Sequence, residues 1–185
     1  GAGSSGLYED KGHGIALDGS GSVYVTGEFS SNSSGTARFG EEQISTDGYS
    51  DVFLSKLDAE SGEWDWTLTN GCTNTHMEGS DVVIDSEGSI WVSGAHHCTS
   101  VQFGSDHIGV DSETFGSSTY QFSDPFLAKA TSSGSWSSAF TMKSAGGESR
   151  IESMAIDEDD RISVVIGMYG HSIQFDAPSA DYGTL

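Results

Sequence analysis

The sequence predicts an all-β fold made of tandem four-stranded antiparallel sheets, and three observations carry this prediction. A strand–turn–strand segment at 14–27 returns at 80–94 and, in a looser form, at 153–167. The chain of 185 residues contains 25 Gly and only 2 Pro, together with many Ser and Thr. No window has the spacing of apolar residues that is typical of an amphipathic helix. Such a composition without helical periodicity indicates an almost purely β chain.

Each copy of the repeated segment has the pattern of a β-hairpin. Its first strand ends in Asp (Asp18, Asp85 or Asp157), whose carboxylate can accept hydrogen bonds from the amides of the turn. In the first two copies a Gly follows three residues later and supplies the positive φ that such a turn needs. The third copy has Asp160 at that position, so we expect its turn to be less relaxed.

The spacing of the copies indicates a four-stranded unit that contains one long loop. Asp85 follows Asp18 by 67 residues, and Asp157 follows Asp85 by 72. In the first unit we expect strands at 14–18, 22–27, 51–58 and 64–68. In the second unit we expect strands at about 81–85, 89–93, 124–129 and 136–140. The third unit supplies its hairpin and a segment at 171–176, and it lacks its third and fourth strands.

The third strands give the strongest repeat signal. Asp51-Val-Phe-Leu-Ser-Lys56 matches Asp124-Pro-Phe-Leu-Ala-Lys129, and both are followed by a Ser-Gly turn and a Trp. This order of motifs resembles the bacterial and archaeal β-propeller repeat called SBBP, over about 8–177. The resemblance implies propeller blades, each a four-stranded antiparallel meander, with recurring Trp and Phe packed between neighbours.

Under this resemblance the chain divides into a partial propeller of about two and a half blades. Blade 1 covers 8–70, blade 2 covers 71–143, and half of blade 3, with its tail, covers 144–185. Residues 1–7 have the composition of a linker or an expression remnant and are left outside the fold. Propellers usually need about four to eight blades to close. We therefore expect either further blades in a longer chain or self-association that completes the ring.

The charge of the chain excludes several classes of partner. With 7 Lys and Arg against 28 Asp and Glu, the formal net charge is −21, which argues against binding to nucleic acid or to an anionic membrane surface. No apolar run approaches the roughly 20 residues of a membrane-spanning helix. We expect an acidic extracellular or cell-surface protein, although no signal peptide is visible in the sequence.

The meander topology brings the long connectors to one rim. The link between the second and third strands of a blade lies at the same end as the link to the next blade. The connectors 28–50 and 95–123 and the inter-blade link 69–79 should therefore share a rim. The six histidines fall in or beside these segments: His13, His76, His96, His97, His107 and His171.

The two cysteines, Cys72 and Cys98, belong to the same rim and allow three interpretations. A disulfide is favoured for an extracellular protein and would close a loop of 26 residues. The second interpretation is a pair of free buried thiols. The third is a zinc-like site, because thiolates and imidazoles occur there at short spacings. Its ligands would be Cys72, His76, His96, His97 and Cys98.

Aromatic and histidine residues of the long loops are the candidates for ligand contact. We single out five that do not recur with the repeat: Tyr49, His107, Phe115, Tyr120 and His171. The acidic clusters Glu41–Glu42 and Asp157–Asp160 could hold Ca²⁺, but they lack the alternating oxygen spacing of an EF-hand loop, so a solvated surface is preferred. No cofactor is expected.

The sequence contains no motif for enzymatic chemistry. It has no Gly-x-Ser-x-Gly, no His-Glu-x-x-His and no phosphate-binding Gly-x-x-x-x-Gly-Lys. We therefore expect a non-catalytic binding or structural scaffold that contacts a protein or glycan through the long loops of one rim. The alternative is part of a propeller enzyme, a glycosidase or lyase, that acts on polysaccharide with a dispersed pair of acids.

Overall fold

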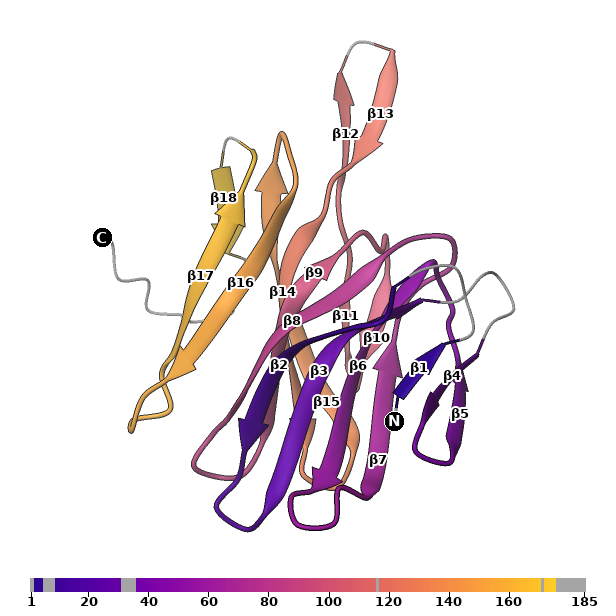
Figure 1. The fold of residues 1–185 in the computed structure, drawn as a ribbon. Coiled ribbons are helices and arrows are strands. Elements are labelled where there is room, and N and C mark those ends of the chain that lie inside the picture. The colour runs from indigo at the N-terminus through magenta and orange to yellow at the C-terminus, as the bar shows by residue number, and fades with distance from the viewer. Residues whose placement is uncertain (1, 5–8, 31–35, 116, 171, 176–185) are drawn as a thin grey trace.

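The computed structural model describes residues 2–4, 9–30, 36–115, 117–170 and 172–175 (Figure 1). These residues form strands and turns, and no helix occurs among them. The described part of the chain accordingly has no helix that is long and apolar enough to cross a membrane. The all-β prediction is confirmed.

The strands follow one another along the whole described chain. In chain order they are β1 (Ala2–Ser4), β2 (Lys11–Leu17), β3 (Ser22–Ser30), β4 (Thr36–Phe39), β5 (Glu42–Ser45), β6 (Ser50–Asp58), β7 (Trp64–Asn70), β8 (Met77–Ile84), β9 (Ile90–His96), β10 (Val101–Phe103), β11 (Asp106–Ile108), β12 (Ser112–Phe115), β13 (Ser118–Gln121), β14 (Asp124–Thr131), β15 (Ser135–Ala145), β16 (Ser149–Ile156), β17 (Ile162–Met168) and β18 (Ser172–Phe175).

The first two repeats each form the expected antiparallel meander. Sheet 1 has the strand order β2-β3-β6-β7, so that each strand pairs with the next one of its unit. Sheet 2 contains β8, β9, β14 and β15 in the same order. The third repeat supplies hairpin 3, the pair β16 and β17. Short hairpins, β4–β5 in the first unit and β10–β11 and β12–β13 in the second, fill the long connectors.

A β-bulge recurs at the same place in every first strand. The register shifts between Gly12 and Gly14 in β2, between Gly79 and Asp81 in β8, and between Ile151 and Ser153 in β16. A bulge adds one unpaired residue and increases the local twist of its strand. The repeat therefore conserves backbone geometry as well as side chains, including in the third, looser copy.

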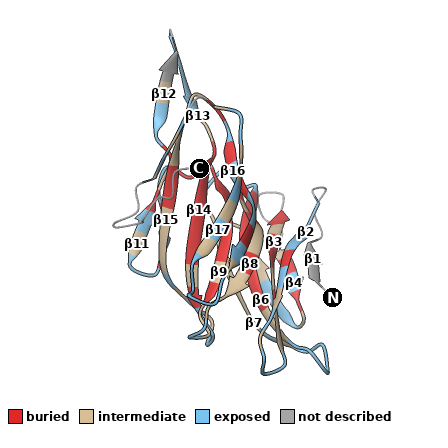
Figure 2. Ribbon diagram, turned by 90° about the vertical axis from the view of Figure 1, so that its left-hand side faces the viewer, coloured by how far each residue is buried: buried red, intermediate tan, exposed pale blue. Residues whose placement is uncertain are grey.

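The sheets pack face to face, and the main core lies between sheet 1 and sheet 2. Tyr24 and Leu54 of sheet 1 pack with Val82, Ile90 and Phe126 of sheet 2, and all five are at most 2% exposed. Figure 2 shows buried residues along strands of both sheets. A smaller cluster joins sheet 2 to hairpin 3. Stacking of this kind buries the apolar face that each sheet presents to its neighbour.

Glycines allow β2 and β3 of sheet 1 to approach β8 of sheet 2 closely. A Cβ atom added at Gly14 would lie 2.7 Å from the Asp81 Cα atom of the next sheet. A Cβ atom added at Gly79 would lie 2.4 Å from the Thr26 Oγ1 atom. The contact between sheets 1 and 2 is thus made partly through the backbone.

The recurring Phe and Trp form edge-to-face pairs. Phe39 of the β4–β5 hairpin lies 5.6 Å from Trp64, and Phe103 of the β10–β11 hairpin lies 4.9 Å from Trp136, measured between ring centroids. Phe103 belongs to the core between the two sheets, and Trp136 Nε1 donates a hydrogen bond of 3.2 Å to the Thr69 carbonyl of sheet 1. The β4–β5 hairpin therefore covers part of the face of sheet 1 that is turned away from sheet 2, and the β10–β11 hairpin covers part of the face of sheet 2 that is turned toward sheet 1.

Two terminal segments form strands whose pairing the sequence did not predict. Residues 2–4, expected to lie outside the fold, form β1 and pair with β4. Residues 172–175, expected to continue the third unit, form β18 and pair with the outer strand β15, which extends sheet 2 to five strands. The physical reason is the same in both places, because an open strand edge has unpaired amides and carbonyls that a passing segment can satisfy whatever its side chains.

Candidate functional site

A pocket of about 330 Å³ opens at the rim that carries the connectors, where the three repeats meet. We call it the rim pocket. Its lining residues are Glu28, His76, Glu78, Ala95, His97, Ser123, Glu148, Ser149, Arg150, Gly167 and Tyr169.

The rim pocket is built on one register position that recurs in every repeat. At this position a residue of the first strand of each repeated hairpin pairs with a residue of the second strand. The pairs are Lys11 with Glu28, Glu78 with Ala95, and Arg150 with Gly167. Glu78 and Arg150 of this position line the pocket directly, and Lys11 lies behind Glu28. Ala95 and Gly167 have no side chain long enough to fill the space beside them.

Every carboxylate that lines the rim pocket has a basic group within 4.0 Å. Lys11 Nζ lies 3.4 Å from Glu28 Oε1, and Arg150 Nη1 lies 4.0 Å from Glu78 Oε1. His97 Nε2 lies 3.5 Å from Glu148 Oε2. The pocket therefore combines hydrogen-bond acceptors and donors instead of presenting one sign of charge.

Glu78 differs from an ordinary surface carboxylate. Burial raises its pKa above the usual value, and the negative charge of Glu28 raises it further. The positive charge of Arg150 acts in the opposite direction. This group is thus easier to protonate than the solvent-exposed acids of the chain.

Hydrogen bonds from sheet 2 and hairpin 3 hold the far wall of the rim pocket. The amide of Ser123 donates to Glu148 Oε2 at 2.9 Å, and the Ser123 hydroxyl donates to the Ser149 carbonyl at 3.1 Å. The Tyr169 amide donates to the Glu148 carbonyl at 2.9 Å. Tyr169 itself is 83% exposed, so its ring is available at the edge of the pocket.

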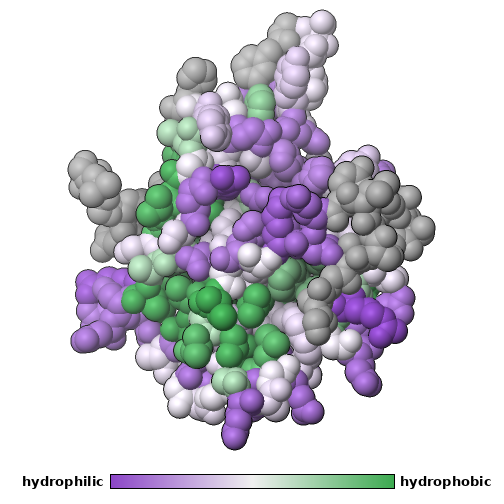
Figure 3. Space-filling model, viewed as in Figure 1, coloured by the Kyte–Doolittle hydropathy of each residue, from purple (hydrophilic) through white to green (hydrophobic). Residues whose placement is uncertain are grey.

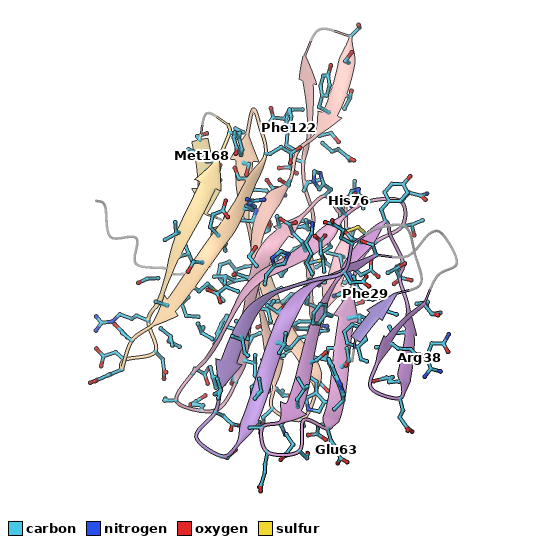
Figure 4. The ribbon with its side chains drawn as sticks, viewed as in Figure 1. Phe29, Arg38, Glu63, His76, Phe122 and Met168 are labelled. Atoms are coloured by element: carbon cyan, nitrogen blue, oxygen red, sulfur yellow. A yellow bond between two sulfur atoms is a disulfide. The ribbon has the colours of Figure 1, made fainter. Side chains whose placement is uncertain are left out.

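A disulfide between Cys72 and Cys98 fastens the inter-repeat link to sheet 2, with a Cα–Cα distance of 5.8 Å. The link also pairs through its backbone, because the His97 amide donates to the His76 carbonyl at 3.0 Å. His76 consequently lies beside the disulfide at the rim (Figure 4). Its ring centroid is 6.4 Å from that of His97 and 5.3 Å from that of Tyr49.

The five residues of the zinc alternative are not brought together as ligands. Both sulfur atoms are engaged in the disulfide. His96 is fully buried, and its Nε2 atom lies 3.1 Å from the Thr141 hydroxyl. Burial lowers the pKa of His96 to about 3. In the described part of the chain no group of three or more His, Cys, Asp or Glu is placed to hold a metal ion. This includes the acidic clusters at 41–42 and 157–160.

Of the five predicted ligand contacts, the three whose side chains the structure describes, Tyr49, His107 and Tyr120, do not line the rim pocket. Tyr49 contacts His76 but does not line the pocket. His107 lies on β11, which packs along the outer strand β15. Tyr120 lies on the β12–β13 hairpin, which projects from the rim (Figure 1), and its ring stacks on Phe122 at 6.1 Å. The Phe115 side chain and His171 lie outside the described residues.

The charged residues of the rim pocket were not among the predicted site residues, although the sequence contains a signal for them. Glu78 follows Lys11 by 67 residues and Arg150 follows Glu78 by 72, the same intervals that separate the turn Asp residues. A charged residue seven positions before each turn Asp is thus part of the repeat. Its role depends on the first strands being adjacent, which the sequence does not state.

Meanders that stack face to face, with their first strands adjacent and a pocket where those strands begin, define a repeat protein of the β-propeller class. Residues 3–33 match the family model described as SBBP, beta-propeller repeat. This segment contains the first repeated hairpin, so the chain is similar to SBBP repeat proteins over that segment. A search of curated proteins returned no match. The number of blades, about two and a half, stays a prediction.

Proposed function

We propose that this chain is a non-catalytic binding and structural scaffold outside the cell or at its surface, and that it binds a glycan in the rim pocket. The observation that carries the proposal is the pocket itself, which is lined by residues of all three repeats. Its volume of about 330 Å³ lies within the usual range of ligand pockets.

The chemistry of the rim pocket suits a polar ligand with many hydroxyl groups. Glu28 and Glu148 offer carboxylate oxygens that accept hydrogen bonds, and Arg150 offers several donors in a fixed plane. Tyr169 adds an exposed ring with an apolar face and a polar tip. A sugar ring presents both hydroxyl groups and an apolar face of C–H groups, so it matches this combination.

Two features support a setting outside the cell. The Cys72–Cys98 disulfide is of a kind that persists in oxidising compartments. The net charge of −21 keeps the surface soluble and disfavours anionic partners.

The proposal is tested by measuring binding of the chain to neutral polysaccharides, namely cellulose, chitin, xylan and starch, and to an array of glycans. Tyr169→Ala and Glu28→Gln should weaken binding at least tenfold. Tyr120→Ala is the matched control, because Tyr120 is also exposed but lies on the projecting hairpin. The proposal fails if no glycan binds, or if the two pocket variants bind as the unmodified chain does.

A second candidate function is hydrolysis or lyase cleavage of polysaccharide. It is favoured by Glu78, whose raised pKa suits a general acid, beside Glu28. Incubation with the same polysaccharides and measurement of new reducing ends or unsaturated products separates this candidate from simple binding. Release of product that disappears in Glu78→Gln would support catalysis, whereas binding without product supports the scaffold.

A further inference from the structure

One face of sheet 1 is open, although the equivalent face of sheet 2 is covered. Ile15 is 64% exposed, whereas Val82, its equivalent in the second repeat, is 2% exposed. Both residues have the same register, since Ile15 pairs with Val25 and Val82 pairs with Val92. Leu17, which lies on the same face as Ile15, is 67% exposed. Figure 3 shows apolar residues gathered over β2.

The exposed residues lie at the positions that bind a neighbouring repeat elsewhere in the molecule. Val82 is covered by sheet 1, through Tyr24 and Leu54. The outer part of the open face is already covered by Phe39 of the β4–β5 hairpin, as Phe103 covers the outer part of sheet 2. Only the area above the two inner strands, β2 and β3, lacks a neighbour among the described residues.

The N-terminal strand indicates what the missing neighbour is. β1 pairs with β4, and Ala2 lies opposite Phe39. β15 pairs with β18, and Met142 lies opposite Phe175. Phe39 and Phe175 end the corresponding connector strands of the first and third repeats. β1 therefore occupies the place of the outermost strand of a repeat that would precede sheet 1.

The other end of the chain offers the inner part of such a repeat. Hairpin 3 contains the first and second strands of a unit, and its face turned away from sheet 2 is also open. Val165 lies on this face and is 63% exposed. No described residue covers its apolar side chain. Hairpin 3 and β1 thus supply the inner and outer strands of one repeat, but from opposite ends of the chain.

We propose that the open face of sheet 1 binds hairpin 3 of a second copy of this chain, head to tail. The contact continues the established stacking of sheet 1 on sheet 2, with Val165 of one copy facing Ile15 and Leu17 of the next. Such a heterologous contact makes a closed ring when its rotation closes. Two or three copies bring about five to eight repeats together, which is the size range of closed propellers.

The mass of the chain in solution, measured by light scattering after size exclusion over a series of concentrations, tests this proposal. The unmodified chain should form a discrete assembly of two or three copies. The double variant Ile15→Asp/Leu17→Asp should be monomeric, and so should Val165→Asp. All three residues are exposed in the single copy, so the variants should keep the circular dichroism of the parent. Tyr120→Asp is the control, because Tyr120 is also exposed, at 48%, but lies away from both faces; this variant should still assemble.

A mixing experiment tests the head-to-tail direction. The double variant retains an intact hairpin 3, and Val165→Asp retains an intact sheet 1 face, so an equimolar mixture should form a dimer with one native contact. The proposal is overturned if the unmodified chain is monomeric at every concentration, or if the double variant assembles like the parent.

A fusion protein tests whether the open face of sheet 1 binds a second copy or a preceding blade of the same polypeptide. Residues 71–141 can be copied ahead of Ala2, so that a complete repeat precedes sheet 1. If this fusion protects an Ile15→Cys thiol from alkylation while the unfused chain stays monomeric, the face belongs to a preceding blade and the second-copy proposal is overturned. If the unfused chain protects the same thiol only when it assembles, the proposal is supported.

Discussion

The Asp160 carboxylate accepts two hydrogen bonds from Ser86, one from its amide at 2.8 Å and one from its hydroxyl at 2.5 Å. These bonds join the hairpin turn of the third repeat to that of the second. Asp160 has a φ of 61° and stands where Gly21 and Gly88 stand in the other copies. A side chain at this φ is strained because of its Cβ atom, and the carboxylate of the same side chain makes the contact with the neighbouring repeat.

Substitution of Asp160 should separate backbone strain from the lost contact. Asp160→Ala keeps a side chain in the left-handed region and loses both bonds, so we expect it to lower the free energy of unfolding by about 1–2 kcal/mol. Asp160→Gly relieves the strain and should stay within about 1 kcal/mol of the parent. Urea unfolding measures both values. Equal stabilities of the Ala and Gly variants would contradict this account, and Ser86→Ala in a double-mutant cycle isolates the contact itself.

Gly14 should be intolerant of any side chain because of its contact with the next sheet. A Cβ atom at this position would lie 2.7 Å from the Asp81 Cα atom, and backbone cannot move aside as a flexible side chain can. Gly14→Ala should therefore cost about 3 kcal/mol, the upper end of the usual range for overpacked cores. Gly19→Ala is the matched control in the same hairpin, since nothing lies within 4 Å of its added Cβ atom. Thermal unfolding of the two variants gives the comparison, and similar midpoints would refute the close approach of the strands.

The Cys72–Cys98 disulfide should contribute about 3 kcal/mol to stability, because it closes a loop of 26 residues in the unfolded chain. Unfolding by guanidinium with and without reductant measures this contribution. The double variant Cys72→Ala/Cys98→Ala should match the reduced protein and should no longer respond to reductant. Titration of the denatured, unreduced chain should find no free thiol, and detection of two thiols would be incompatible with the disulfide.

His96 should make the fold sensitive to acid. Its pKa is lowered to about 3 by burial, whereas the unfolded chain binds a proton there near the ordinary value of 6.5. The unfolded state therefore binds more protons between these values, and stability falls as the pH drops below 6.5. At pH 5 the loss from this one residue is about 2 kcal/mol.

Replacement of His96 by Phe should remove this part of the pH dependence. Phe29 occupies the equivalent position in sheet 1 and packs beside Phe53 as His96 packs beside Phe126. A Phe ring is therefore already accommodated at this position of the repeat. Urea unfolding at pH 7 and pH 5 should give a stability difference between the two conditions that is smaller in His96→Phe than in the parent. Identical differences would show that His96 does not titrate on unfolding. Exposed His107→Phe serves as the control.

Much of the fold could be predicted because its signals are local. The turn at Asp18 needs a carboxylate to bond amides two and four residues on, and the structure has both bonds, to Ser20 at 2.9 Å and to Ser22 at 2.8 Å. Such contacts depend on a few neighbouring residues, which repeat with them. The candidate site was less predictable, because Arg150 and Glu78 come within 4.0 Å only after the inner strands of two repeats are side by side.

The sequence by itself determined the repeated hairpins and the meander order of each sheet, because turn chemistry and alternation along a strand act over short stretches of chain. Tertiary structure alone decided that β1 and β18 pair with the strands they do, that the rim pocket forms beside Ala95, and that Ile15 remains exposed while Val82 is buried. These outcomes depend on which edge and which face of a sheet find a neighbour. That neighbour comes from a distant part of the chain, so no local pattern encodes it.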